Sequence, residues 1–478
     1  MMKYSAVNSG EIGGRRGAVL VLLSFAMLIV SLDQYIVVVA LPDIASGLGY
    51  SRQTLQSVVS AYAIASSGFL LLGGRASDLL GRRRVFMVGL VLYCVSSLAG
   101  GLATNVFQQL AARSFQGLGG ALVFPSTLAL INVRFREGAE RNRALGIWAG
   151  AGAAGLVVGV LLGGALTGLF GWRAVFLVNV PLAALALAAA FILIETDGPI
   201  DRSRTFDLPG AATITASITL LVAALVQGPD WGWVSPLTIS LLFAGASLGA
   251  AFVVIERRSV DPLIPPRMLQ NSWLRLALAV ATLFMATFGA VLYFLSIFFQ
   301  NVLHYDALNT GLAFLLPTAV VVGSSTLAGR AATLIGLRAV MISALALGAV
   351  GALAIGVTLK PEMSFTDLVP GLIALSIGDG AMFTAMFIAA ATDVPDHQQG
   401  VASGMVSTGS GLGAAIGLAL LVLIANAATA GLSGKALRAA TADGISRAAY
   451  AISFGIIFTL VIVLAFRAQK GDGRSSQE

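Results

Sequence analysis

The sequence predicts an all-α polytopic membrane protein, built as two six-helix bundles with a two-helix hairpin inserted between them. Of its 478 residues, 57% are hydrophobic and only 11% are charged, against roughly 25% charged residues in soluble domains. The chain also contains fourteen apolar runs long enough to cross a bilayer, and its two halves share glycine motifs at a nearly constant spacing. These observations exclude a water-soluble enzyme.

Each predicted span is a long run of apolar residues. Crossing roughly 30 Å of hydrocarbon takes about 20 helical residues, and a helix pairs its backbone polar groups internally. The first run reaches about 25 residues and lacks a small-residue cleavage site, so we interpret it as a span rather than a secretory signal. In chain order the predicted spans are 17–41, 54–73, 83–103, 107–131, 142–165, 172–194, 207–227, 236–255, 275–300, 309–329, 338–358, 368–391, 402–426 and 447–467.

The distribution of positive charge predicts the orientation of the chain. Of the 29 Lys and Arg residues, 22 fall on the side of the two termini, six on the other side, and Arg113 inside a span. Cytoplasmic loops carry the excess of Lys and Arg in membrane proteins. We therefore expect both termini to be cytoplasmic.

An internal repeat divides the chain. Motifs that begin at Gly74, Gly155 and Gly119 recur after 255, 254 and 259 residues. These offsets match spans 1–6 with spans 9–14, the layout of a carrier whose two bundles rock around a site near the middle of the bilayer. The predicted parts are a cytoplasmic N-terminal segment (1–16), an N-terminal bundle (17–194), an inserted hairpin with linkers (195–272), a C-terminal bundle (273–467) and a cytoplasmic tail (468–478).

The residues that several other kinds of chemistry need are missing. One cysteine and two histidines form no cluster for zinc or a redox metal, and the sequence has no GxxxxGK[ST] loop for ATP. The net charge of +7 is explained by loop residues that set topology, so no nucleic-acid partner is expected. We expect no cofactor, metal or nucleotide, a lipid bilayer and a small-molecule substrate as partners, and a monomer.

Asp33 lies about two thirds of the way across the first span. An ionised carboxylate within the bilayer costs on the order of 3 kcal/mol, so its presence indicates a function, with a structural ion pair as the alternative. We interpret Asp33 as the principal proton or cation site.

Arg113 and Gln116 lie in the fourth span. A cation that faces the interior would hold a nearby carboxylate ionised, whereas an arginine that reaches the outer interface would be structural. We interpret Arg113, together with Gln116, as the coupling partner of Asp33.

Asp379 lies between two glycines near the middle of the twelfth span. A second acid, in the opposite half, could bind a cationic substrate or a second proton. The alternative is a local hydrogen bond to backbone that the neighbouring glycines expose.

The loop after the second span is a candidate cytoplasmic gate. A carboxylate at the end of a helix can bind arginines or a helix N-terminus in one conformation and release them in another. Thr333 replaces the acid in the second half, which predicts a weaker contact there. The candidate gate residues are Gly74, Asp78, Gly81, Arg82 and Arg83.

Glycines recur at every fourth position in the fifth and thirteenth spans. Such a stripe allows another helix to approach closely, so we expect a packing role. The residues concerned are Gly155, Gly159, Gly163, Gly164, Gly409, Gly413 and Gly417.

Aromatic and methionine side chains in the spans are candidates for lining an adaptable apolar cavity. Taken singly, each could equally face lipid or pack in the core. The candidates are Tyr35, Phe124, Trp148, Phe288, Phe294, Met382, Phe383 and Met386.

The sequence resembles the major facilitator superfamily, specifically its fourteen-helix drug:proton antiporter branch, over almost its whole length. In this chain Val160 stands where the antiporter motif of the branch has proline, and Leu79 stands where the superfamily loop has arginine. The matching residues are Asp33 with Leu41 and Pro42 in the first span; Gly74, Asp78, Gly81 and Arg82 in the loop; Arg113, Gln116 and Gly117 in the fourth span; and Trp172, Arg173, Phe176, Asn179 and Pro181 before and within the sixth.

The resemblance implies a major facilitator fold in the bacterial cytoplasmic (inner) membrane, and a carrier rather than an enzyme. We expect an antiporter that exports hydrophobic, cationic or amphipathic drugs and biocides in exchange for protons. A dedicated exporter of one metabolite or antibiotic is the nearest alternative, followed by a proton-coupled symporter. A membrane enzyme or channel is disfavoured because the spans contain no nucleophile–base pair or metal cluster.

Overall fold

The structure, a computed structural model, describes residues 4–50, 55–198, 207–429 and 431–466. In this part of the chain, which contains no strand, fourteen helices are long and apolar enough to cross a membrane, as the sequence predicts. The α-helices are α1 (Tyr4–Leu48), α2 (Ser57–Leu80), α3 (Arg82–Gly101), α4 (Val106–Arg134), α5 (Ala139–Phe170), α6 (Ala174–Leu177), α7 (Asn179–Leu193), α8 (Leu208–Trp231), α9 (Pro236–Glu256), α10 (Ser272–Ile297), α11 (Ala307–Ala313), α12 (Leu315–Leu334), α13 (Leu337–Thr358), α14 (Phe365–Ala391), α15 (Gln399–Asn426) and α16 (Gly434–Ala465). Short 3₁₀ turns at Pro266–Gln270 and Asp396–Gln398 precede α10 and α15, and a π-helical turn at Phe298–Val302 follows α10.

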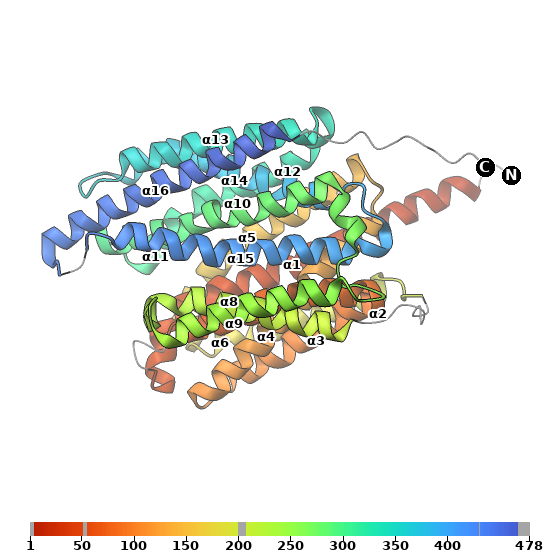
Figure 1. The fold of residues 1–478 in the computed structure, drawn as a ribbon, viewed down its shortest axis with the longest axis horizontal. Helices are drawn as coiled ribbons and strands as arrows, with labels where there is room; N and C mark the ends of the chain where they lie inside the picture. Colours follow the sequence, from red (N-terminus) through yellow and green to blue (C-terminus); the bar gives the residue numbers. More distant parts are fainter. Residues whose placement is uncertain (1–3, 51–54, 199–206, 430, 467–478) are drawn as a thin grey trace.

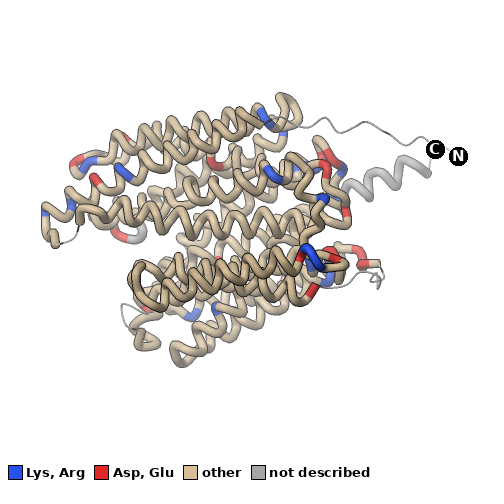
Figure 2. Tube along the Cα trace, viewed as in Figure 1, with Lys and Arg blue, Asp and Glu red and all other residues tan. Residues whose placement is uncertain are grey.

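The helices run side by side, so the molecule has two distinct ends (Figure 1). The start of α1 and the finish of α16 lie at the same end, as expected for an even number of spans (Figure 1). Charged residues gather at the two ends, and the length between them is almost entirely uncharged (Figure 2). This distribution suits a slab of hydrocarbon around the middle of the helices.

The glycine stripes pack against corresponding helices in the two halves. A Cβ at Gly155, Gly159 or Gly163 of α5 would collide with the backbone of α1. A Cβ at Gly413 or Gly417 of α15 would collide with the backbone of α10. The fifth and thirteenth predicted spans, which are α5 and α15, therefore make equivalent close approaches to α1 and α10. Only residues without a side chain permit such approaches.

Gly164 does not share this role. It follows Gly163 by one residue and so faces away from α1, and a Cβ added to it would meet nothing within 4 Å. The expectation that Gly164 packs against another helix is wrong, because an α-helix turns by about 100° per residue.

Two predicted spans contain a break. The sixth span is divided at Val178 into α6 and α7, and the tenth is divided at Phe314 into α11 and α12. Pro181 in the first turn of α7 has no N–H to donate to Leu177, which is consistent with the break just before it. Because of this break, Asn179 is the first residue of α7.

Helices α8 and α9, the predicted inserted hairpin, pack against each other, and α8 also packs against α2 and α15. Ser217 of α8 donates a hydrogen bond to the carbonyl oxygen of Gly245 of α9 at 2.7 Å, and Ser60 of α2 donates to Gln227 of α8 at 3.3 Å. The domain boundaries stay a prediction, and the predicted tail 468–478 lies outside the described residues.

Candidate functional site

Asp33 of α1 lies at the centre of a buried polar cluster. Arg113 of α4 forms an ion pair with Oδ2 of Asp33 at 2.6 Å. Gln116 of α4 and Asn179 of α7 each donate a hydrogen bond to the other oxygen, Oδ1, at 2.8 Å. All four side chains are at most 1% exposed. The carboxylate charge is therefore compensated entirely by protein groups from two other helices.

Arg113 is also held by groups other than Asp33. Its Nε donates to the carbonyl oxygen of Val58 at 3.1 Å, and Nη1 donates to Oε1 of Gln116 at 2.7 Å. The guanidinium group lies 4.6 Å from the centre of the Tyr62 ring, a favourable cation–π distance. The cluster thus joins α1, α2, α4 and α7, and a change in the charge of Asp33 would act on all of them.

Asp379 of α14 has a different environment. Its side chain is half-buried, and among the described residues it has no hydrogen bond or ion pair. Tyr35 of α1, two residues after Asp33, lies within electrostatic range of Asp379. The structure therefore brings together three of the four predicted coupling residues, namely Asp33, Arg113 and Gln116. The fourth, Asp379, lies apart from them in the other half.

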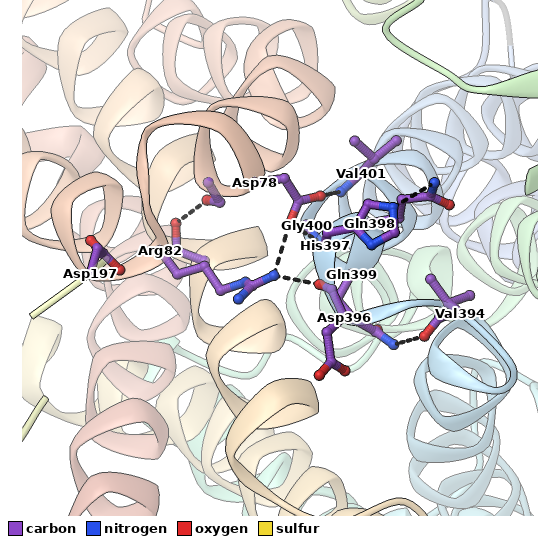
Figure 3. Close-up of polar contacts among 12 residues, drawn as sticks. Asp78, Arg82, Asp197, Val394, Asp396, His397, Gln398, Gln399, Gly400 and Val401 are labelled. Carbon is purple, nitrogen blue, oxygen red and sulfur yellow. Dashed lines mark hydrogen bonds and ion pairs between the residues drawn. The ribbon is translucent and has the colours of Figure 1, made fainter. Parts of the chain in front are cut away.

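Asp78, near the C-terminal end of α2, caps the N-terminus of α15 (Figure 3). Its Oδ1 accepts from the backbone N–H of Gly400 at 3.0 Å, and its Oδ2 accepts from that of Val401 at 2.8 Å. Arg82 donates to Asp78 at 3.3 Å and also to the carbonyl oxygen of Asp396, just before α15. The first N–H groups of a helix lack intrahelical partners and attract negative charge. This contact links the first half of the chain to the second.

A related contact joins the halves at the corresponding place in the repeat. Asn142 of α5 donates to the hydroxyl of Thr333 of α12 at 3.2 Å. A Cβ at Gly329 would collide with the carbonyl oxygen of Asn142, just as one at Gly74 would collide with that of Gly400. The two contacts have the same close backbone approach, but only the first includes a carboxylate.

The remaining gate candidates contact their own half. Gly81 ends α2 with φ of 103°, which favours glycine, and a Cβ there would collide with Asp197. Asp197 accepts from the backbone N–H of Arg83 at 3.2 Å and of Arg84 at 2.9 Å, which caps α3. The Arg83 side chain donates to the carbonyl oxygen of Phe191 at 3.1 Å. Arg83 therefore does not cross between the halves in this conformation.

The aromatic candidates pack against one another around Trp148 of α5. The Trp148 ring stacks on Phe383 of α14 at 6.2 Å between centroids, with edge contacts to Phe124 of α4 at 5.3 Å and Phe387 of α14 at 5.4 Å. Trp148 is fully buried and donates to the hydroxyl of Thr127 at 3.1 Å. The cluster joins α4 and α5 of the first half to α14 of the second.

The other cavity candidates differ in exposure. Met382 and Met386 are completely buried, Phe288 is 4% exposed, and Tyr35 is half-buried. Phe294 lines a small apolar pocket formed by α10, α13, α14 and α16. The methionines are therefore core residues in this conformation.

Two buried polar residues were missed as functional candidates. Asn179 completes the Asp33 cluster, and it is the only amide in the sixth predicted span, a signal that the sequence offered. Arg75 of α2 is fully buried and forms an ion pair at 2.8 Å with Asp261, which follows α9. No sequence signal pointed to Asp261, because it lies in a loop among other charges. Among the described residues, no group of three or more His, Cys, Asp or Glu could hold a metal ion.

Comparison with known proteins identifies the family. The Major Facilitator Superfamily profile matches residues 23–418. The chain is 36% identical over 465 residues to the puromycin resistance protein pur8 of Streptomyces alboniger, covering 95% of this chain and 91% of that protein. It is 37% identical to the cephamycin export protein CmcT of Amycolatopsis lactamdurans, covering 86% of this chain and 85% of that protein. The multidrug resistance protein Stp of Mycobacterium tuberculosis (strain ATCC 25618 / H37Rv) is 34% identical, over 84% of this chain and 74% of Stp.

Solved structures show the same fold. The human organic anion transporter MFSD10 (TETRAN) superposes with a TM-score of 0.70 at 17% identity, covering 94% of this chain and 99% of that one. The proton:xylose symporter XylE superposes with a TM-score of 0.66 at 14% identity, covering 95% and 96% of the two chains. At these identities the likeness concerns the fold alone.

Proposed function

We propose that this chain, which belongs to the major facilitator superfamily, exports hydrophobic, cationic or amphipathic drugs in exchange for protons. Members of this family are membrane transporters and not enzymes. The relatives support efflux, since they include a puromycin resistance protein, a multidrug resistance protein and a cephamycin export protein. We place it in the bacterial cytoplasmic membrane with both termini in the cytoplasm, and we take one chain as the transport unit.

The buried pair of Asp33 and Arg113 is the single observation that carries the proposal. A proton that binds Asp33 removes the negative charge and leaves the Arg113 cation without its counter-ion in a buried site. Such an uncompensated charge costs several kcal/mol, so protonation favours a conformation in which Arg113 finds water or another partner. The proton is released when the pair forms again.

Asp379 serves in this proposal as the site for the cationic part of the substrate or for a second proton. It has no competing ion pair in the described structure, and the phenol group of Tyr35 lies within electrostatic range of it. Exchange of one proton for one monovalent cation is electroneutral and uses only the pH gradient. Exchange of two protons for one monovalent cation moves one net charge, so the membrane potential would also drive transport. A potential of 100 mV contributes about 2.3 kcal/mol per charge, and one pH unit contributes about 1.4 kcal/mol.

The contact between Asp78 and α15 acts as a latch. In the proposed orientation it closes the cytoplasmic end, and the aromatic cluster around Trp148 lies between α4, α5 and α14. Opening to the cytoplasm requires the two halves to separate there, which breaks the cap on α15 and the link between Asn142 and Thr333. The latch thereby influences the conformational equilibrium without contacting substrate.

Transport by purified protein in proteoliposomes tests the proposal. With an imposed pH gradient, wild-type protein should move a cationic dye against its gradient, and Asp33→Asn should abolish this coupling while retaining exchange of dye across the membrane. Coupled transport by Asp33→Asn at the wild-type rate would exclude Asp33 as the proton site. Clamping the membrane potential separately would show whether a second proton is moved.

A dedicated exporter of one antibiotic is the second candidate. The relatives include both a multidrug resistance protein and a cephamycin export protein. A competition panel of structurally unrelated dyes, biocides and antibiotics separates the two: broad competition indicates a multidrug transporter, and competition by one chemical class indicates a dedicated one.

A further inference from the structure

We propose that Asn179 is a positioning residue for the proton site, holding the Asp33 carboxylate in its charged form through a hydrogen bond from α7. The inference rests on the proposed role of Asp33 as the proton carrier. Asn179 makes α7 the second helix, after α4, that donates hydrogen bonds directly to the Asp33 carboxylate.

The geometry of Asn179 is that of a direct ligand of the carboxylate. Its Nδ2 lies 2.8 Å from Oδ1 of Asp33, and the side chain is fully buried. The other contact of Nδ2, with the carbonyl oxygen of Val175 one turn earlier, is longer, at 3.5 Å. The break before α7 places Asn179 at the start of this helix, where α7 packs against α1.

The acceptor side of the same amide is unused. Oδ1 of Asn179 is buried without a hydrogen-bond partner in the described structure. Gln116 differs, because its Oε1 accepts from Arg113 and its Nε2 donates to both Asp33 and Ser97. A buried unsatisfied carbonyl destabilises a fold. An apolar residue at this position would leave no carbonyl unpaired. The hydrogen bond from Nδ2 to the Asp33 carboxylate therefore accounts for an amide at this position.

Few other charged or titratable groups face Asp33. Arg113 contributes from α4, Tyr62 from α2 and Tyr93 from α3, and the nearest titratable residue on α1 itself is Tyr35. Helices α6 and α7 contain no titratable residue, and the part of α5 that follows residue 143 contains none. Asn179 is therefore the one polar group that the α7 side brings to this carboxylate.

The test measures protonation of Asp33 directly in full-length protein in lipid. A hydrophobic carbodiimide modifies protonated carboxyl groups, and mass spectrometry of the peptide that contains Asp33 gives the fraction modified at each pH. Asn179→Leu removes the donor at similar volume, so the carboxylate loses stabilisation and the proton stays bound to higher pH. We expect the midpoint of labelling to rise by about one to two pH units.

Asn179→Asp provides the second variant. It has nearly the same shape but replaces the donor by a second carboxyl group at hydrogen-bonding distance from Asp33. Two carboxylates that share a site disfavour each other's ionisation. Because Arg113 pairs with Asp33, the shared proton resides on the new carboxyl group, which then donates to Asp33 in place of the amide. The labelling midpoint of Asp33 should therefore rise less than in Asn179→Leu, and the pH profile of gradient-driven efflux should shift in the same order. A purely structural role for Asn179 predicts no such order.

Gln109→Met is the matched control. Gln109 of α4 is also a fully buried amide, but in the described structure it has no hydrogen-bond partner and so donates no hydrogen bond to Asp33. This variant should leave both pH profiles unchanged. If labelling of Asp33 in the wild-type protein does not vary with pH, Asp33 is not the proton site and the proposed function itself is contradicted. A normal wild-type titration that Asn179→Leu leaves unshifted would overturn only the role of Asn179.

Discussion

The two halves of the molecule share a packing frame but differ in how their polar groups are paired. In the first half, Asp33 receives three hydrogen-bond donors and is fully buried. In the second half, Asp379 is half-buried and has no hydrogen bond or ion pair in the described structure. Helix packing requires only that small residues recur at the right spacing, so a repeat can retain its shape while its charges change.

The contacts between the halves show the same asymmetry. Asp78 caps α15 with two charge-assisted hydrogen bonds, whereas Thr333 accepts one neutral hydrogen bond from Asn142. Hydrogen bonds to charged groups contribute roughly twice as much as neutral ones. The first half therefore contains the more fully paired acidic residue and the stronger contact between the halves.

Breaking the Asp33 cluster should have the largest effect. Arg113→Met leaves a buried carboxylate without its counter-ion, so we expect a loss of about 3–5 kcal/mol in the free energy of unfolding. Thermal denaturation in detergent, followed by size-exclusion chromatography, measures this loss. The double variant Asp33→Asn/Arg113→Met removes both charges and should recover most of the stability but none of the proton coupling. Equal stability of the single and double variants would contradict the pairing.

Asp379→Asn should have the opposite effect on stability, because it removes a charge that has no partner. The protein should be at least as stable as wild type, while its apparent affinity for a monocationic substrate falls about 10- to 100-fold, the loss expected for one charge-assisted contact. An uncharged substrate of similar size, measured by competition, serves as the control. If both substrates weaken equally, Asp379 does not bind the cation.

Asp78→Asn tests the stronger latch. An amide can accept only one of the two hydrogen bonds from α15 and carries no charge, so we expect a shift of about 1–2 kcal/mol towards the state that is open at the cytoplasmic end. Distance distributions between spin labels on α2 and α15 measure this population. An unchanged distribution would show that the cap does not influence the equilibrium.

Thr333→Val should have the smallest effect, about 0.5–1.5 kcal/mol. The Thr333 hydroxyl makes two neutral hydrogen bonds, but only the one from Asn142 joins the two halves, because the one to the carbonyl oxygen of Gly329 lies within α12. Thr333→Ser retains the hydroxyl and is the control. The same labels, placed on α5 and α12, report the change. Thr333→Asp would supply the acid that the first half has, so it should strengthen the second contact and make the two halves more alike.

Much of the fold could be predicted from the chain. Apolar runs identified all fourteen spans, because hydrocarbon leaves a helix little alternative to pairing its own backbone groups. The exact ends were less accurate: α16 begins at Gly434, whereas the predicted span begins at 447. A helix can continue beyond the hydrocarbon, where hydropathy no longer marks its limits.

Part of the candidate site could also be predicted. Asp33, Arg113 and Gln116 were recognised because a charged or amide group within a span is costly, and the structure places the three in contact. Asn179 was not assigned to the site, since one amide among apolar residues gives no direction or partner. The role of Gly164 was predicted wrongly, because neighbouring glycines look alike in sequence but face different sides of a helix.

The sequence by itself determined that the chain has fourteen apolar runs long enough to cross a membrane, that its glycine motifs repeat, and which polar groups lie within those runs. These properties depend on composition and on spacing along one helix. Only the tertiary structure decided that Asp33 is paired while Asp379 is not, and that Asp78 reaches a helix more than 300 residues further along the chain. Such pairings depend on how far each helix is rotated about its axis and which neighbour it faces, and no local pattern specifies either.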